Sequence, residues 1–255
     1  MTSTFKTVDF DNAIDGKFAV VTGAASGIGA AISHALSSKG VKVAILDLDI
    51  NSAKKVASTL SGAIAVECNV SVPSSVDEAF KSVMKHYGRV DILVNSAGIV
   101  DLAACEELSH EAWKRTIDIN LTGSFFVAQA FGRQMISQKS GRIINLASKA
   151  GSVAIEHHVA YCASKFGVIG MTKTMALEWG KYGITVNSIS PTVVLTELGK
   201  KAWDGPKGDA LINDIPVGRF AEPEEIAATA VFLASSGAQM INGADILVDG
   251  GYTIK

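Results

Sequence analysis

Short apolar runs alternate with longer amphipathic stretches along the whole chain. The runs are rich in Val and Ile and too apolar for strands with one face in water, so they predict strands covered on both faces, as in a parallel sheet. The predicted strands are Phe18–Thr22, Val41–Leu46, Ala63–Cys68, Val90–Val94, Arg142–Ala147, Thr185–Ile189 and Asp245–Val248. The predicted helices are Ile28–Ser38, Ser52–Leu60, Ser74–His86, Glu111–Ile136, Val159–Lys181 and Pro223–Ser235. This alternation predicts a doubly wound α/β fold with helices on both faces of a seven-stranded, mainly parallel sheet.

The domain organisation follows from length and composition. The chain has 255 residues, 48% of them hydrophobic, and no repeat or Pro/Gly/Ser-rich linker, so we expect one domain over 1–255. Residues 1–15 form a polar N-terminal extension without the pattern of a secretory signal. Residues 192–218 form a long insertion after the sixth strand, which predicts a substrate lid; a surface excursion or an oligomer contact would be the alternatives.

Charge and cysteine content narrow the function classes. The net charge is −2 and the pI is about 6.2, so we expect neither nucleic acid nor an anionic membrane as partner. No apolar run reaches the length of a membrane span. Three scattered cysteines favour a reducing compartment, and no His or Cys spacing indicates a metal site. A soluble cytoplasmic protein is therefore expected.

A glycine-rich loop follows the first predicted strand. Gly23, Gly27 and Gly29 allow a tight turn and a close approach to a pyrophosphate, with Ser26 and Ile28 between them. The helix that follows offers free N–H groups to an anion. A glycine-rich packing turn is the alternative, but the strand–loop–helix context favours a dinucleotide site.

Asp47 ends the second predicted strand. A carboxylate there accepts hydrogen bonds from the adenosine ribose and repels a 2′-phosphate, and the residue after it is Leu48 rather than Arg. The sequence therefore predicts NAD rather than NADP; a local strand-end cap is the other interpretation.

The next two strands also end in residues suited to a cofactor. Asn69 and Val70 end the third strand and are expected to flank the adenine. Asn95, Ala97 and Gly98 end the fourth, where Gly admits the cofactor and Asn95 ties down the neighbouring strand or the ribose.

Four residues form the candidate catalytic set. Tyr161 and Lys165 are four apart in a helical pattern, so they share one face, and a nearby ammonium is expected to lower the pKa of the phenol. Ser148 follows the fifth strand, from which its hydroxyl can reach the oxygen that Tyr161 protonates. Asn120 lies in the long helix before that strand and is expected to hold a water near Lys165.

These residues, in this order behind a dinucleotide loop, resemble the short-chain dehydrogenase/reductase family from about Gly16 onward. The resemblance implies a Rossmann fold, a nicotinamide cofactor, a homotetramer and a catalytic tetrad of Asn120, Ser148, Tyr161 and Lys165. It also implies that the turn after Pro191 meets the nicotinamide through Val194 and Thr196. Thr192 stands where the family usually has Gly, and the turn resembles that of the polyol dehydrogenase and L-xylulose reductase branch.

The expected substrate is a short linear polyol of about four to six carbons, interconverted with its ketose, because the segment before Tyr161 is polar and a polyol needs hydrogen-bond partners. His158 matches a histidine of that branch, and Trp203 either covers the pocket or packs the lid. Glu156 and His157 either line the pocket or face solvent. Alternatives are a reductase of 3-oxoacyl thioesters, a steroid dehydrogenase, or a non-catalytic dinucleotide sensor.

Overall fold

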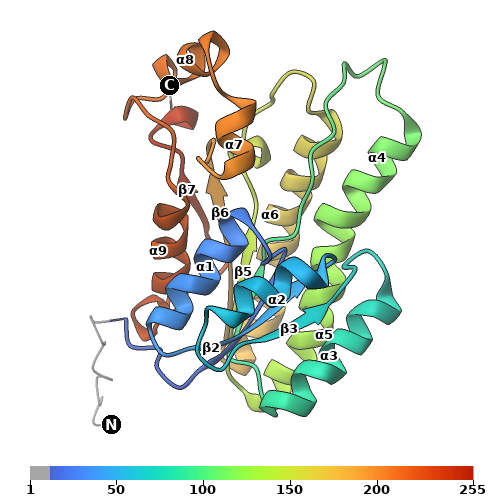
Figure 1. The fold of residues 1–255 in the computed structure, drawn as a ribbon, viewed down its shortest axis with the longest axis vertical. Coiled ribbons are helices and arrows are strands. Elements are labelled where there is room, and N and C mark those ends of the chain that lie inside the picture. Colours follow the sequence, from blue (N-terminus) through green and yellow to red (C-terminus); the bar gives the residue numbers. More distant parts are fainter. Residues whose placement is uncertain (1–11, 255) are drawn as a thin grey trace.

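The computed structural model describes residues 12–254. Seven parallel strands form one sheet in the order β3-β2-β1-β4-β5-β6-β7 (Figure 1). The strands are β1 (Phe18–Thr22), β2 (Lys42–Asp47), β3 (Ile64–Glu67), β4 (Ile92–Asn95), β5 (Gly141–Leu146), β6 (Ile184–Pro191) and β7 (Asp245–Val248). The predicted seven-stranded, doubly wound sheet is confirmed.

Helices cover both faces of the sheet. On one face lie α1 (Gly27–Ser38), α2 (Ile50–Ser58) and α9 (Pro223–Ala234); on the other lie α3 (Pro73–Tyr87), α5 (Ser124–Gln138) and α6 (Val159–Trp179). Each face has its own buried core, with Ile32, Leu36 and Ile226 in the first and Val83 and Phe131 in the second. Burial on both faces explains why the strands are apolar without alternation.

The sheet order places a crevice above β1 and β4. From β1 the chain moves outward through β2 to β3, then returns to pair β4 with the other edge of β1. The loops that leave the carboxyl ends of these two strands therefore run in opposite directions. In open α/β sheets ligands bind at this switch point.

The helix predicted over Glu111–Ile136 is interrupted. It consists of α4 (His110–Ile117), a π-helical turn at Asp118–Gly123 and α5. A π turn adds one residue to a helical turn and so departs from the regular 3.6-residue period on which the prediction of one helix rests. Such turns are frequent at functional sites. Here the turn contains Asn120.

The insertion at 192–218 contains two short helices, α7 (Glu197–Ala202) and α8 (Pro206–Asn213). An isolated parallel bridge between Val194 and Ala221 joins its two ends. At the far end, the backbone N–H of Val217 donates to the carbonyl of Gly250 at 3.1 Å, so the insertion lies beside the C-terminal turn (Figure 1).

Candidate active site

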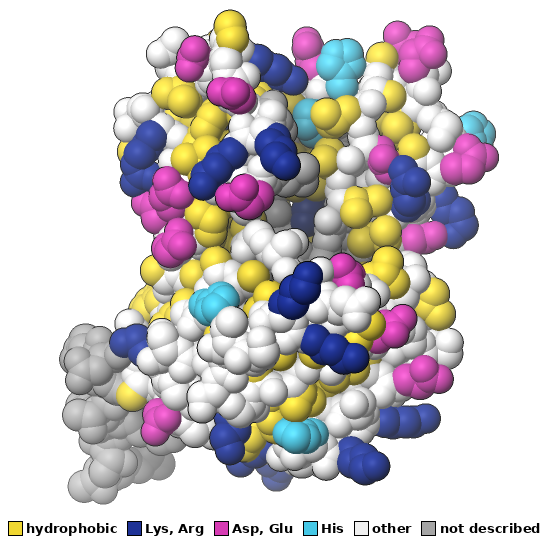
Figure 2. All heavy atoms as spheres, in the orientation of Figure 1, with side chains coloured by type: hydrophobic (Ala, Val, Ile, Leu, Met, Phe, Trp, Pro, Cys, Tyr) yellow, Lys and Arg dark blue, Asp and Glu magenta, His cyan; other side chains and the backbone are white. Residues whose placement is uncertain are grey.

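A cleft of about 710 Å³ lies at the carboxyl ends of the strands, and Figure 2 shows the surface hollowed between the α7–α8 segment and the rest of this face. It brings together most of the predicted site residues, from seven separate segments of the chain. They are Gly23, Ser26, Gly27, Ile28, Gly29, Asp47, Asn69, Val70, Ala97, Gly98, Ser148, Tyr161, Lys165, Pro191 and Thr196.

The glycine loop leaves room for a ligand. Gly23 has a φ of +61°, and a Cβ there would lie 2.7 Å from Cα of Ala97, so only glycine lets the two loops approach. A Cβ on Gly29 would lie 2.3 Å from the carbonyl oxygen of Gly23. Ser26 caps α1 without a side-chain hydrogen bond, so the first N–H groups of α1 stay available to an anion. The loop fits a dinucleotide pyrophosphate.

Asp47 combines a structural contact with a place in the cleft. Its two carboxylate oxygens accept the backbone N–H of Ala25 and of Asp49, each at 3.0 Å. The acid therefore holds the glycine loop against β2 and lines the cleft. Each carboxylate oxygen retains capacity for a further donor. Leu48 and Cys68 line the cleft beside it and were not predicted from the sequence.

Thr192 supplies an unsatisfied hydroxyl at the cleft. The residue is 8% exposed and lines the cleft, and among the described residues its Oγ1 has no hydrogen-bond partner. A buried hydroxyl without a partner is costly, so its position favours a polar ligand group at this wall. A dinucleotide with a polar nicotinamide carboxamide fits that requirement.

Thr196 links the insertion to the glycine loop. Its Cγ2 would lie 3.4 Å from a Cβ on Gly27, and its hydroxyl accepts the N–H of Gly199 at 3.1 Å to cap α7. Glu197, the first residue of α7, also lines the cleft. Val194 is buried in the core behind the cleft and is not among its lining residues.

Ser148, Tyr161 and Lys165 meet at one wall. The Ser148 hydroxyl accepts the N–H of Ala150 at 3.2 Å and hydrogen bonds to the Tyr161 phenol. Lys165 is 5% exposed; its Nζ lies 5.5 Å from the Tyr161 ring centroid and donates to the carbonyl of Leu146 at 2.7 Å. A hydroxyl, a phenol and an ammonium thus converge from β5 and α6.

The electrostatics of this trio differ from the sequence-based expectation. Burial raises the pKa of the Tyr161 phenol above its usual value, while the hydrogen bond with Ser148 acts in the opposite direction. Burial also lowers the pKa of Lys165 to about 8. The lowering of the Tyr161 pKa expected from Lys165 is therefore not found in this structure, where desolvation of the phenol is the largest cause of the shift.

Asn120 and Asn95 lie behind the wall. The Asn120 amide accepts the N–H of Ile99 at 2.8 Å and donates to the carbonyl of Ile99 at 2.9 Å and to Ser164 Oγ at 3.1 Å. It therefore fixes the loop after β4, and the predicted water is a further role that stays a prediction. Asn95 donates to Oδ1 of Asn145 at 2.9 Å and so ties β4 to β5.

The two predicted substrate residues have different surroundings. The His158 ring lies edge-on to the Tyr161 ring at a centroid distance of 6.1 Å. Its Nδ1 is 2.6 Å from the carbonyl oxygen of Glu156. Because a carbonyl only accepts, Nδ1 carries the proton and Nε2 is left as an acceptor. Trp203 packs on Phe220 at 6.2 Å under Lys207, outside the lining of the cleft.

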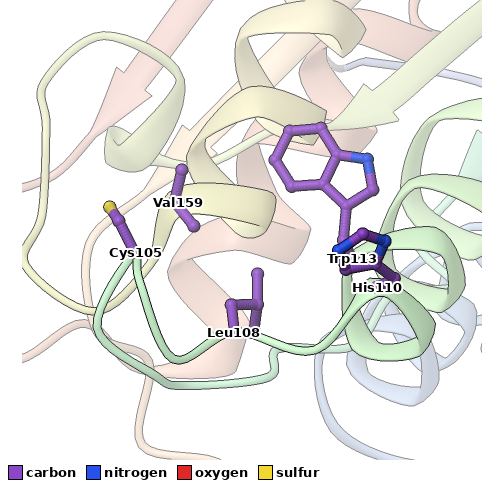
Figure 3. Close-up of a pocket in the computed structure, with 5 residues that line it drawn as sticks. All are labelled: Cys105, Leu108, His110, Trp113 and Val159. Atoms are coloured by element: carbon purple, nitrogen blue, oxygen red, sulfur yellow. The ribbon is translucent and has the colours of Figure 1, made fainter.

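A second cavity of about 320 Å³ lies between the loop before α4, α4 and the start of α6 (Figure 3). Cys105, Leu108 and Val159 face it from one side and the side chains of His110 and Trp113 from the other. It contains none of the predicted site residues. Within residues 12–254, no group of three or more potential ligands is placed to hold a metal ion, and no helix has the length and apolarity to cross a membrane.

Comparison with known proteins identifies a matching family model and several similar dehydrogenases. A family model described as enoyl-(acyl carrier protein) reductase matches residues 23–253. The D-threitol dehydrogenase of Mycolicibacterium smegmatis is 57% identical over 97% of both chains. The NAD-dependent glycerol dehydrogenase of Listeria innocua serovar 6a is 47% identical over 99% of this chain and 100% of the relative.

Among solved structures, a gluconate 5-dehydrogenase from Burkholderia cenocepacia J2315, in complex with NADP and tartrate, is 32% identical with a TM-score of 0.91. The match covers 96% of this chain and 98% of that one. With the glycine loop, the Ser148–Tyr161–Lys165 wall and these matches together, the chain belongs to the short-chain dehydrogenase/reductase family.

Proposed function

We propose that this chain is an NAD-dependent dehydrogenase that interconverts a short linear polyol of about four to six carbons and the corresponding ketose. The meeting of Ser148, Tyr161 and Lys165 at the wall of a dinucleotide cleft is the observation that carries this proposal. Two relatives named for threitol and glycerol support the substrate class.

The residues divide the proton chemistry between them. In the oxidation direction, Tyr161 takes the proton of the substrate hydroxyl. A nicotinamide cofactor, when bound, would supply the acceptor for the hydride of the carbon that bears this hydroxyl. Ser148 donates a hydrogen bond to the substrate oxygen and holds it beside the phenol. Lys165 keeps an amine within reach of the same face. In the reduction direction Tyr161 returns its proton to the ketone oxygen.

The direction of the Tyr161 pKa shift agrees with this division. Because burial raises that pKa, the phenol stays protonated across neutral pH, which suits proton donation to a ketone. Oxidation needs the phenolate, so its rate rises with pH. A positively charged nicotinamide in the cleft would lower the same pKa and assist oxidation.

Asp47 supports NAD as the cofactor. Its carboxylate stands at the end of β2 among the cleft residues, where a 2′-phosphate would meet like charge. Asn69 and Val70 line the adjoining part of the cleft and suit the adenine. One relative is named NAD-dependent, whereas the gluconate dehydrogenase structure holds NADP, so the choice calls for direct measurement.

His158 supports a substrate with several hydroxyls. Its ring centroid lies 6.1 Å from that of Tyr161, and its Nε2 can accept a hydrogen bond from a hydroxyl adjacent to the reacting one. The charged residues that line the cleft are Asp47, Lys165 and Glu197. Since the single cation among them belongs to the catalytic wall, a neutral polyol fits better than a sugar acid.

The proposal is tested by initial rates of NADH formation at 340 nm with tetritols, pentitols and hexitols, each run with NAD and with NADP. We expect one or a few stereoisomers with NAD to give the highest kcat/KM. Tyr161→Phe should abolish the rate while NAD still binds. Full activity of that variant would refute the mechanism, and silence of the whole panel would refute the substrate class.

A reductase of acyl-carrier thioesters is the second candidate, because the description of the matching family model names that class. Such a substrate needs a cationic docking surface. On the face drawn in Figure 2, Lys and Arg are interspersed with Asp and Glu. Rates with a 3-oxoacyl thioester and NADPH, measured beside the polyol panel, separate the two; a non-catalytic sensor would be silent in both.

We further propose that residues 1–255 act as one domain in a cytoplasmic homotetramer, with 192–218 as the substrate lid. The contact between Thr196 and Gly27 supports the lid, because it joins α7 to the cofactor loop. Sedimentation of the purified chain tests the tetramer. Protection of 197–213 from hydrogen exchange on addition of NAD and polyol tests the lid.

A further inference from the structure

A buried lysine stands directly after the proposed catalytic serine. Lys149 is 6% exposed and begins the 3-10 turn Lys149–Gly151, for which Ser148 is the N-cap. Its Nζ lies 3.5 Å from the centroid of the Tyr252 ring. The reaction described above does not use this charge, although the residue adjoins the active-site wall.

Tyr252 comes from the C-terminal turn, which has its own internal support. The Asp249 carboxylate, 5% exposed, accepts the N–H groups of Gly251 and Thr253, each at 2.9 Å, and the Thr253 hydroxyl at 2.7 Å. A Cβ on Gly251 would lie 3.0 Å from Pro216, so the turn also packs closely on the end of the lid. The backbone that carries the Tyr252 ring is therefore held in place.

The contact between ring and ammonium is strong because of where it lies. A lysine ammonium removed from water loses much of its hydration, and an aromatic face replaces part of that stabilisation. Lys149 also accepts the N–H of Ser152 and of Val153 on its carbonyl, each at 3.0 Å. The lysine is thus fixed at both its side chain and its backbone.

We propose that Tyr252 and Lys149 are a positioning pair that orients Ser148 toward Tyr161, so that the C-terminal turn supports the active site. The pair acts through the backbone of the 148–151 turn, whose first bond joins Ser148 Oγ to the N–H of Ala150. This inference rests on the proposed function for its kinetic consequence, but its structural consequence is independent of the substrate.

The first test is hydrogen exchange on four variants. Tyr252→Leu removes the aromatic face, and Tyr252→Phe keeps it. Tyr182→Leu is a matched control that removes the ring 5.2 Å from Lys181 Nζ, and it lies after the last turn of α6, whereas Tyr161 and Lys165 lie near the first. We expect exchange at residues 148–153 to rise about tenfold in Tyr252→Leu alone among the tyrosine variants. Lys149→Met keeps a side chain of similar length but removes the charge, and it should raise exchange at residues 148–153 as Tyr252→Leu does.

The second test is the pH profile of kcat for polyol oxidation. The Ser148 bond opposes the rise of the Tyr161 pKa, so misplacing Ser148 should move the profile to higher pH. The other titratable groups that face Tyr161 are Lys165, Cys162 and His158, and none of them is altered.

A double-mutant cycle completes this test. Ser148→Ala and Tyr252→Leu should each move the profile in the same direction, and the double variant should move it no further. Tyr252→Phe should restore the normal profile.

Unchanged exchange at 148–153 in both Tyr252→Leu and Lys149→Met would overturn the proposal. So would additive shifts in the cycle, or a loosening equal throughout the sheet, which would indicate a merely structural role. An inactive wild type would refute the proposed polyol reaction instead, while the exchange experiment would still decide the positioning pair.

Discussion

Thr192→Val is predicted to change stability and cofactor affinity in opposite directions. The wild-type hydroxyl is buried at the cleft with no partner among the described residues, and Val replaces it by a methyl group of similar shape. In the folded chain the substitution removes an unsatisfied polar atom. In the complex it removes the partner that this atom would offer to the ligand.

The size of each effect follows from the hydrogen bonding of the Thr192 hydroxyl in the chain without cofactor and in the complex with NAD. An unsatisfied buried hydroxyl costs about 1–3 kcal/mol, so the variant without cofactor should gain about 1 kcal/mol of unfolding free energy. For a chain of this size that corresponds to a Tm about 2–4 °C higher. A hydrogen bond to the ligand is worth about 0.5–1.5 kcal/mol, so the Kd for NAD should rise roughly 2- to 13-fold.

Calorimetric unfolding without cofactor and a fluorescence titration with NAD measure the two quantities. Thr192→Ser is the matched control, because it keeps the hydroxyl and should keep the wild-type affinity. A Thr192→Val variant that is less stable than the wild type would show that the hydroxyl already has a partner. An unchanged Kd for NAD would show that the hydroxyl does not face the cofactor.

Two further substitutions test charged residues that line the cleft, and a third tests His158 beside Tyr161. Asp47→Asn keeps an acceptor for Ala25 but removes the charge, so the ratio of kcat/KM for NAD over NADP should fall by about tenfold or more. Lys165→Met should abolish turnover yet raise stability at pH 7, because burial lowers the Lys165 pKa to about 8 and charging the folded amine is unfavourable. The unfolded lysine binds more protons between that value and 10.5, so wild-type stability should rise with pH across this window, and the rise should vanish in the variant on urea titration. His158→Ala should raise the KM for the polyol and leave the Kd for NAD unchanged; equal polyol KM values would exclude His158 as a contact.

The fold was predictable because its signals are local. Each buried strand is a short apolar run rich in Val and Ile, and for all seven strands the starts and ends lie within two residues of the prediction. The π-helical turn at Asp118–Gly123 was not predicted, because the prediction assumed a regular 3.6-residue period throughout the helix. The helices of the insertion were also missed, because α7 and α8 are short and largely polar.

The cofactor loop and the catalytic wall differ in what the sequence reveals. Gly23, Gly27 and Asp47 could be placed because a strand must end before a helix begins, and the carboxyl ends of parallel strands share one edge. The direction of the Tyr161 pKa shift could not be predicted from the sequence, because it depends on how much of the ring the fold buries. Spacing in the sequence shows which side chains share a helix face, but it does not show how far those side chains are removed from water.

Contacts between segments that are distant in the sequence were not predicted. Thr192 was noticed only as a departure from a family pattern, and its orphan hydroxyl emerges from the packing of β6 against β7 and the insertion. Lys149 and Tyr252 are more than a hundred positions apart, and neither belongs to a motif. The residues proposed for cofactor binding and proton transfer lie at strand ends or at helical spacing and follow a motif, whereas the residues that support them are determined by packing. A search for positioning residues in this enzyme should therefore begin from buried charges beside the wall, as Lys149 illustrates, and not from motifs.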